Sequence, residues 1–401
     1  MVAPALARYL TLGDDDLAGW ERAHERTARG IAALGTELGG LYIKVCQVIG
    51  ARADVLPAVF VRELSRFHDR VPPRPLAELA PVLERELGRP LDPVFAHFET
   101  TPQAAASLAQ VHRAKLRDGS LVAVKIQYPE ARRLFASDLS NVRRGARWAA
   151  RLFPRFPLRG AVEEIAERIA LELDFAREGE SLERVAAAFK DDPDVRIPRL
   201  YTELSGPRVL VMEWLDGTPI HELERLRADG VDLPGLADRL ARIYRRMIFE
   251  HGFFHGDPHP GNLLVLRDGR IGLLDFGLAK SLPPGFGAHL ARMFASALAA
   301  DSAGAVAHAR ALGFELAGAD PDTFLRGLGI ALGAKHEIAD LRDVLGAGLG
   351  ARVPPDIALV VRTLVLLNGL SERLAPGERR IARELVAGAV AALSPPGESR
   401  A

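Results

Sequence analysis

Three short motifs follow one another along this chain, and each stands beside an apolar run. They are VAVK at residues 122–125, HGDPHPGN at 255–262 and DFG at 275–277. Each motif alone is weak, because a strand ending in lysine and a tripeptide such as DFG are both common by chance. Their combination in this order, with an Asp-x-x-x-x-Asn spacing inside the middle motif, is a much stronger structural signal than any one of them.

The residue types in these motifs match the needs of phosphoryl transfer from ATP. That reaction requires a loop that covers the phosphates, a lysine that contacts them and a carboxylate that holds the lysine. It also requires a divalent metal and a base near the phosphate acceptor. Asp257 and Asn262 have the spacing of a kinase catalytic loop, and Asp275 opens the DFG that supplies a metal carboxylate. Lys125 is one of only six lysines among 52 basic residues. The use of lysine in a chain that otherwise prefers arginine indicates that this position requires a compact ammonium group. We therefore predict a nucleotide site.

Composition argues against several other classes. The 401 residues carry 52 basic and 52 acidic side chains, and this balance argues against nucleic acid as the main partner. The single cysteine, Cys46, excludes an intramolecular disulfide and favours a cytoplasmic location. The N-terminus lacks a basic and apolar leader, so we expect no signal peptide. The apolar stretch from Ile357 contains Arg362, and we expect a buried helix there rather than a membrane span.

The periodicity of the apolar residues predicts an α+β chain. Helical patterns cover 1–70, 76–87 with Gly88 and Pro90 at its end, 131–190, and most of 217–393. Strands are predicted at 107–116 and 120–128 around an Asp-Gly turn, near 196–204 and 208–217, and in a second Asp-Gly hairpin over 262–277.

This order of elements predicts two lobes, a small one that contains a sheet and a larger helical one. We predict a helical N-terminal extension over 1–93, the small lobe with a helical insert over 94–216, and the helical lobe over 217–401. A cleft between the lobes is the expected place for a ligand.

Several segments resemble the UbiB/AarF family of atypical protein-kinase-like proteins. They are AAASLAQVH, VAVKIQYP, ELDF, HGDPHPGN, LLDFG and, in the extension, GGLYIKVCQ, which is similar to that family's Lys-x-Gly-Gln signature. The resemblance runs from about residue 35 to about residue 280. It implies a two-lobed protein-kinase-like fold and an ATP- and magnesium-dependent kinase or ATPase that supports isoprenoid quinone or related lipid metabolism. ATP or ADP and Mg²⁺ are the implied cofactors.

The resemblance also implies a role for each motif residue. Lys125 would contact the nucleotide phosphates and pair with Glu178, Asp257 would be the catalytic base, and Asn262 and Asp275 would bind magnesium. Two further segments would contact the nucleotide: the adenine hinge (Met212, Glu213, Trp214, with backbone groups of the first and last) and an alanine-rich loop in place of a glycine-rich one (Ala104, Ala105, Ala106, Ser107). In the family, this alanine-rich loop is associated with altered nucleotide preference and with restrained protein-kinase activity.

The family's extension folds over the place where a protein substrate would dock. Here Lys44 and Gln47 of the extension would face Glu172 and Asp174 of ELDF as regulatory contacts. Cys46 departs from the family's usual glycine, which puts the local fit of the extension in question. We interpret this thiol as a small buried apolar group rather than a reactive one.

Other residues in these segments have plain structural interpretations. We expect His255 to shape the catalytic loop and His259 to belong to local loop structure. Gly256 stands where the family more often has alanine, which we expect to matter little. The charged run at 132–147 is interpreted as a solvated helix face, with contact to acidic lipid as the alternative.

Two rival functions stay open beside the leading one. A small-molecule phosphotransferase of the aminoglycoside-kinase type shares the catalytic-loop spacing but has no place for the alanine-rich loop or for Lys44 and Gln47. A nucleotide-binding scaffold without turnover would keep all the same residues. The sequence leaves the acceptor open among a small molecule, a lipid, a quinone precursor, a protein and water, and contact with a membrane would be peripheral. No Ala-Pro-Glu follows DFG, and the short segment 278–286 argues against conventional protein phosphorylation.

Overall fold

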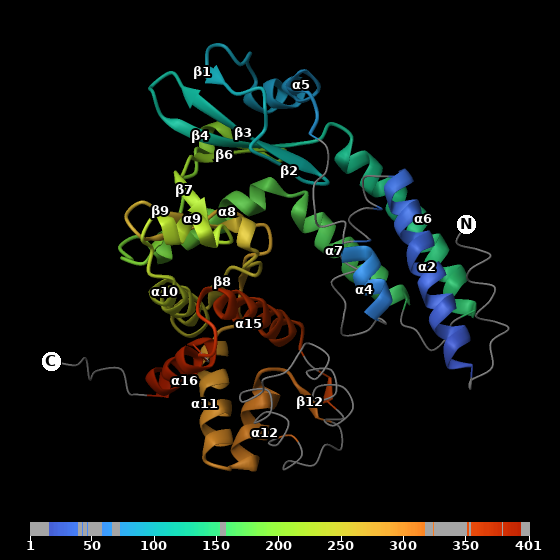
Figure 1. Ribbon diagram of the computed structural model, residues 1–401, viewed down its shortest axis with the longest axis vertical. Helices are drawn as coiled ribbons and strands as arrows, with labels where there is room; N and C mark the ends of the chain where they lie inside the picture. The colour runs from blue at the N-terminus through green and yellow to red at the C-terminus, as the bar shows by residue number, and fades with distance from the viewer. Residues whose placement is uncertain are drawn as a thin grey trace. The chain divides into compact units, whose positions relative to one another are not determined.

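The chain forms two compact units in the computed structural model (Figure 1). Unit 1 comprises Met1–Gly179 and Leu200–Trp214, and unit 2 comprises Glu180–Arg199 and Leu215–Ala401. The structure describes residues 16–38, 42, 46, 58–65, 73–152, 158–316, 324, 351–352, 354–378 and 380–393. The predicted α+β, two-lobed fold class is confirmed, whereas the predicted boundaries at 93 and 216 stay predictions.

Two helices of the predicted extension, α2 (Leu17–Leu38) and α4 (Ala58–Ser65), pack against each other. Cys46 is buried beside them with Ala32 and Leu64, and its thiol donates to the Ile31 carbonyl at 3.8 Å. Burial raises the pKa of Cys46 to about 11, so the thiol stays protonated at neutral pH. The interpretation of Cys46 as a buried apolar group is confirmed. Lys44 and Gln47 lie outside the described residues.

The sheet of unit 1 is antiparallel throughout and has the order β1-β3-β4-β6, with β2 pairing beside β3. Its strands are β1 (Phe95–Phe98), β2 (Ala104–Ala105), β3 (Ala109–Leu116), β4 (Leu121–Gln127) and β6 (Val209–Glu213). The predicted Asp-Gly hairpin joins β3 to β4, and Gly119 adopts φ 92°, a conformation that glycine tolerates without a steric cost.

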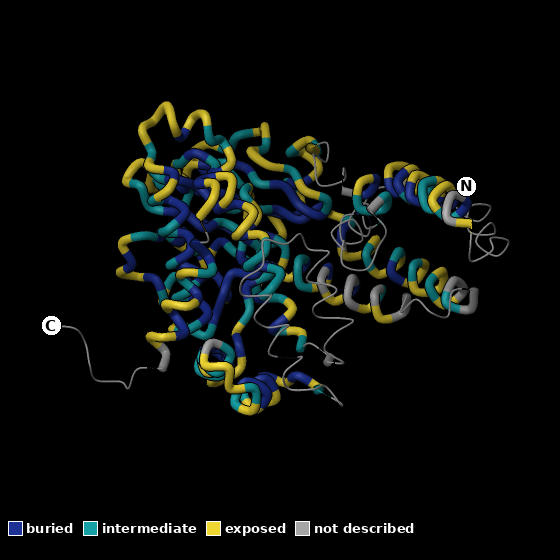
Figure 2. Tube along the Cα trace, turned by 60° about the horizontal axis from the view of Figure 1, so that its bottom comes forward, coloured by how far each residue is buried: buried dark blue, intermediate teal, exposed yellow. Residues whose placement is uncertain are grey.

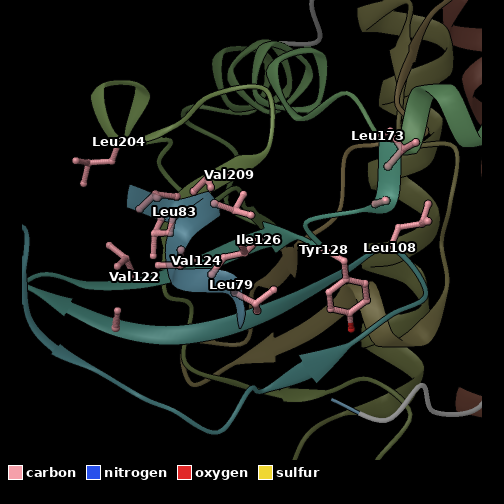
Figure 3. Close-up of a cluster of buried hydrophobic side chains, with 14 of the residues drawn as sticks. Leu79, Leu83, Leu108, Val122, Val124, Ile126, Tyr128, Leu173, Leu204 and Val209 are labelled. Carbon is pink, nitrogen blue, oxygen red and sulfur yellow. The ribbon is translucent and has the colours of Figure 1, made fainter. Parts of the chain in front are cut away.

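Side chains of β4 point alternately to the two faces of the sheet. Val122, Val124 and Ile126 point to one face, where they pack against Leu79 and Leu83 of helix α5 (Leu76–Leu87) (Figure 3). Because side chains alternate between faces along a strand, Lys125 points to the opposite face. The predicted end of α5 is confirmed, since Gly88 follows it with φ 63°.

Three helices occupy most of the predicted helical insert: α6 (Ala131–Leu152), α7 (Leu158–Glu172) and α8 (Phe175–Ala188). Helices α6 and α7 pack together, and Arg143 of α6 forms an exposed ion pair with Glu163 of α7. The exposed arginines of α6 agree with the interpretation of this run as a solvated face.

Unit 2 contains a four-stranded sheet of order β5-β10-β9-β7 and a two-stranded pair, β8 with β11. Their bounds are β5 (Val195–Arg196), β7 (Gly217–Pro219), β8 (Phe253–Phe254), β9 (Leu263–Leu266), β10 (Ile271–Leu273) and β11 (Lys280–Ser281). The prediction for 196–204 was too long: the strand there is β5, and Leu200 forms an isolated bridge with Met212. β5 pairs with β10, so it belongs to unit 2 although it falls inside the predicted small lobe.

The other described residues of unit 2 are mostly helical. The helices are α9 (Leu223–Ala228), α10 (Leu233–Arg246), α11 (Phe286–Leu298), α12 (Ser302–Ala311), α15 (Pro355–Leu374) and α16 (Arg380–Leu393), with a short strand pair β12 (Glu315–Leu316) and β13 (Ala351–Arg352). Buried and exposed segments alternate along the chain (Figure 2), as expected for helices that bury one face. The stretch from Ile357 is the half-buried helix α15, as predicted. Among the described residues, none of the helices has the length and apolarity that a bilayer crossing requires.

Candidate active site

Lys125 and Glu178 form a close ion pair inside unit 1. The Lys125 Nζ atom lies 2.7 Å and 2.8 Å from the two carboxylate oxygens of Glu178. The Glu178 side chain is 2% exposed and that of Lys125 is 16% exposed. The predicted pair is therefore present, and it is formed by a carboxylate that is almost completely removed from water.

The ELDF segment explains why Glu178 points to this place. Asp174 caps the start of α8: its side chain accepts the Arg177 N–H at 3.2 Å, and its carbonyl accepts the Glu178 N–H at 3.0 Å. Phe175 is buried, and its ring lies 5.0 Å from the Lys125 ammonium. Glu178 thus sits in the first turn of a helix, where a carboxylate is favoured by the helix dipole. Asp174 caps this helix, and the regulatory contact predicted for Glu172 and Asp174 stays a prediction because its partners are not described.

A second link joins the same two segments, and the sequence patterns did not reveal it. The buried Gln127 side chain of β4 donates to the Leu173 carbonyl at 2.8 Å, immediately before the cap residue. Arg132 donates to the same carbonyl at 3.0 Å. The strand that carries Lys125 is therefore bonded to the start of α8 by the Lys125–Glu178 pair and to the residue before Asp174 by Gln127, which fixes the register of α8 against that strand.

The alanine-rich loop forms a tight hairpin in this structure. Ala104 and Ala105 form β2 and pair with β3, and the Ala106 N–H donates to the Ala109 carbonyl at 2.8 Å. That N–H is engaged inside the loop, unlike the phosphate-facing amides of a glycine-rich loop. Ser107 is half-buried at the turn. The role of these residues toward a nucleotide stays a prediction.

Sequence patterns also gave no role to the Gln and His of AAASLAQVH. Gln110 is buried, and its side-chain amide forms two hydrogen bonds with the main chain of Arg74. Its Oε1 accepts the Arg74 N–H at 2.9 Å, and its Nε2 donates to the Arg74 carbonyl at 3.0 Å. The same Nε2 lies 2.8 Å from His112 Nε2, and His112 Nδ1 lies 2.8 Å from the Glu99 carbonyl. These two motif residues therefore hold the chain that precedes α5 onto the sheet.

The sheet uses part of the backbone of the predicted adenine hinge. The Trp214 N–H donates to the Leu121 carbonyl at 3.0 Å, and Met212 pairs with Ala123 of β4. Because the sheet uses the Trp214 N–H, this group is not available as an adenine donor. An adenine contact elsewhere in 212–214 stays a prediction, as does the role of Glu213.

The catalytic-loop residues come together in unit 2. The Asn262 Nδ2 atom lies 3.3 Å from Asp257 Oδ2. His259 is exposed and shapes the turn between them, since its Nδ1 accepts the Gly261 N–H at 3.1 Å and its carbonyl accepts the Asn262 N–H at 2.8 Å. The interpretation of His259 as local loop structure agrees with these bonds.

The DFG segment lies against the same loop. Asp275 accepts the Gly277 N–H at 3.0 Å, and Phe276 is fully buried with its ring centroid 5.5 Å from that of His255. His255 Nδ1 also lies 3.2 Å from the Tyr244 hydroxyl. Burial lowers the pKa of His255, although the charges of Asp257 and Asp275 oppose this shift. A buried, neutral His255 fits the expected role in shaping the loop.

The expectation for Gly256 was wrong. A Cβ atom at this position would lie 2.5 Å from the Leu278 carbonyl oxygen, which is a backbone atom that cannot rotate away. Alanine at 256 therefore requires a shift of the HGDPHPGN loop or of the segment after DFG. Glycine is used here because two stretches of main chain approach each other closely.

The side-chain oxygens of Asp275 and Asn262 suit magnesium. Asp275 offers a carboxylate, and with its Nδ2 turned toward Asp257, Asn262 retains its amide oxygen, so both are the hard oxygen ligands that Mg²⁺ prefers. Within the described residues, His, Cys, Asp and Glu side chains do not gather in groups of three or more that could hold a metal ion. Mg²⁺ commonly uses one or two protein ligands and completes its shell with phosphates and water, so two ligands are enough for nucleotide-bound magnesium.

Comparison with known proteins agrees with these motifs. Residues 66–309 match the model of the ABC1 atypical kinase-like domain. The Drosophila melanogaster AarF domain-containing kinase 1 is 33% identical over 386 residues, which cover 90% of this chain and 74% of that protein. An Arabidopsis thaliana relative, Protein ACTIVITY OF BC1 COMPLEX KINASE 1, chloroplastic, is 39% identical over 258 residues, or 62% of this chain and 37% of that protein.

Further similarity extends to a cyanobacterial protein and to a solved structure. The uncharacterized protein sll0005 of Synechocystis is 34% identical over 85% of this chain, and the chain spans 52% of that protein's length. The complex structure of Rv3197 with erythromycin from Mycobacterium tuberculosis superposes with a TM-score of 0.59 at 29% identity, covering 92% of this chain and 100% of that one. The family model matches more than half of the chain, and the matched part contains VAVK, HGDPHPGN and DFG. The chain therefore belongs to the ABC1 (AarF/UbiB) family of atypical kinase-like proteins.

Proposed function

We propose that this protein binds ATP with Mg²⁺ and catalyses an atypical phosphoryl transfer or ATP hydrolysis. The observation that carries the proposal is the Lys125–Glu178 ion pair, in which both carboxylate oxygens contact one ammonium. In the kinase template this pair holds the lysine against the nucleotide phosphates. A purely structural pair would leave unexplained why lysine is used here in a chain that otherwise prefers arginine.

The proposed roles of the remaining residues follow from their chemistry. Asp257 is the base that accepts a proton from the acceptor hydroxyl or from water. Asn262 and Asp275 hold Mg²⁺, which when bound neutralises phosphate charge. The Asn262 amide also orients the Asp257 carboxylate, from which it lies 3.3 Å.

The biological output that we propose is support of isoprenoid quinone or related lipid metabolism. This part of the proposal rests on the family resemblance of the motifs. If the phosphoryl group goes to an acceptor other than water, that acceptor is a lipid, a quinone precursor or a protein that meets the enzyme peripherally at a membrane. The short segment between DFG and α11 supports a reaction other than conventional protein phosphorylation.

Nucleotide-dependent stabilisation tests the binding step. A ligand at about 100 times its Kd stabilises a one-site protein by about 2.7 kcal/mol, which a thermal shift detects easily. We expect Mg-ATP to stabilise the wild-type protein and Lys115→Ala, which removes an exposed lysine from the same sheet. Lys125→Ala should lose the shift. The paired variant Lys125→Met/Glu178→Leu serves the same purpose without leaving a buried charge unpartnered.

Turnover separates an enzyme from a scaffold. Hydrolysis or transfer of the ATP γ-phosphate is measured with and without vesicles that contain anionic lipid. We expect turnover that depends on Mg²⁺ and is lost in Asp257→Asn. Nucleotide binding without turnover under either condition would favour the scaffold alternative, and an unchanged ATP shift in Lys125→Ala would remove the nucleotide assignment.

A further inference from the structure

We propose that Thr363 of helix α15 is a positioning residue for the catalytic loop. Its hydroxyl donates to the carbonyl oxygen of Gly256 at 3.3 Å, one residue before Asp257. The two residues are 107 positions apart in the sequence, and Thr363 is 0% exposed. The proposal rests on the proposed function of Asp257 and names what holds that residue in place.

Thr363 interrupts an apolar stripe, and this is the first sign that its hydroxyl has a purpose. The buried face of α15 is otherwise aliphatic apart from Ser371 (Ile357, Val360, Leu367, Leu370, Leu374). A hydroxyl placed in such a face is costly unless it is hydrogen-bonded. Threonine in a helix can bond the carbonyl one turn earlier in its own helix, whereas here the bond goes to a different segment.

Gly256 also lies close to the main chain of the segment that follows DFG. The Gly256 main chain is packed so closely against the Leu278 carbonyl that a Cβ atom would lie 2.5 Å from it. Gly256, the residue before Asp257, therefore lies close to the Leu278 main chain and accepts a hydrogen bond from the Thr363 hydroxyl. Misplacing a reacting group by about 1 Å can cost about a hundredfold in rate, so a contact that fixes this segment has kinetic value.

The same helix also contacts the strand that follows DFG. β8 leads into the HGDPHPGN loop, β11 follows DFG, and the two pair through Lys280 with Phe254. Lys280 forms an ion pair with Asp356 in the first turn of α15. This pair is partly exposed, at 42% for Lys280 and 23% for Asp356, and such pairs contribute little. We therefore place the positioning role on Thr363 and treat Asp356 as a secondary contact.

Helix α15 lies outside the part of the chain that matches the family model, which ends at residue 309. The motifs that identify the site likewise end with DFG. Helix α15 therefore contributes to the position of the loop although it belongs to none of the motifs. It acts through the hydrogen bond from Thr363 to the main chain of the loop, without a contact to the nucleotide.

The test compares Thr363→Val with Thr363→Ser. Valine removes the hydroxyl at nearly constant volume, and serine restores it. The matched control is Ser371→Ala, which deletes another fully buried hydroxyl from the same face of the same helix. Each protein is measured for ATP turnover, for nucleotide Kd and for amide hydrogen exchange over residues 253–262.

We expect Thr363→Val to lower kcat by up to about tenfold, the effect of one lost hydrogen bond, with nucleotide Kd changed by less than about twofold. Exchange over 253–262 should become faster in this variant, and Thr363→Ser and Ser371→Ala should resemble the wild type. Wild-type turnover and protection in Thr363→Val would overturn the proposal, and so would an equal loss in Ser371→Ala. If the wild type shows no turnover, the proposed function fails, and the exchange comparison alone then decides whether Thr363 holds the loop.

Discussion

Replacing Glu178 with glutamine tests whether the Lys125–Glu178 pair is as desolvated as the structure has it. The variant keeps the shape of the side chain and removes its charge. It leaves the Lys125 ammonium beside a neutral amide, one half of which is itself a donor. We expect a large loss of folding stability, because the ammonium cannot regain full hydration.

The size of the loss follows from the geometry. At 2.7 Å and an effective dielectric constant of about 20, the gross attraction between the two charges is about 6 kcal/mol. Removal of one partner of a buried pair typically costs about 3–5 kcal/mol. Because Lys125 is 16% exposed and retains some hydration, we expect the lower end of this range, about 3 kcal/mol.

The double variant Lys125→Met/Glu178→Leu sharpens the test. Replacing both partners of a buried pair with apolar groups is often neutral or stabilising, so the double variant should be at least about 2 kcal/mol more stable than Glu178→Gln. Urea unfolding followed by tryptophan fluorescence is the assay, because all three tryptophans lie in unit 1 with this pair. A loss below about 1 kcal/mol in Glu178→Gln, or a double variant no more stable than the single one, would show that the pair is solvated.

Three other perturbations have definite expected outcomes. Asp275→Asn should remove most magnesium-dependent nucleotide binding, because an amide offers one uncharged oxygen to a hard cation; equal affinities in a magnesium titration would contradict the assignment. Ala106→Gly should raise ATP affinity and self-phosphorylation by freeing the loop whose Ala106 N–H is now bonded to Ala109, and a phosphate-incorporation assay that shows no change would remove the restraint mechanism. Burial lowers the pKa of His112 below its usual 6.5, so the stability linked to its neutral form is present above that pH and is lost as the pH falls. His112→Asn should therefore flatten the decline in unfolding free energy from about pH 7 to about pH 5, and an unchanged slope would exclude this linkage.

Local chemistry was sufficient to predict much of the fold. Apolar runs predicted the two strands at 107–116 and 120–128, and Asp-Gly turns located both hairpins, because these features depend only on neighbouring residues. Glycine at 88 marked the end of α5 for the same reason, since a left-handed residue after a helix has a local steric cause. The residue types of HGDPHPGN and DFG indicated their chemistry, because carboxylate and amide oxygens are hard ligands for Mg²⁺ in any fold.

What surrounds these residues depended on contacts that no local pattern encodes. Glu178 lies 53 positions from Lys125, and Thr363 lies 107 positions from Gly256. How the backbone of 212–214 is used could not be predicted locally, because a backbone donor bonds to whichever strand lies next to it, and only the sheet order decides that. Gly256 was misjudged for a related reason, since the carbonyl that excludes a side chain there comes from beyond DFG. Sequence determined which groups are present and which face of their own element they occupy, whereas tertiary packing decided which of them meet, because distant segments become neighbours only when the chain is folded.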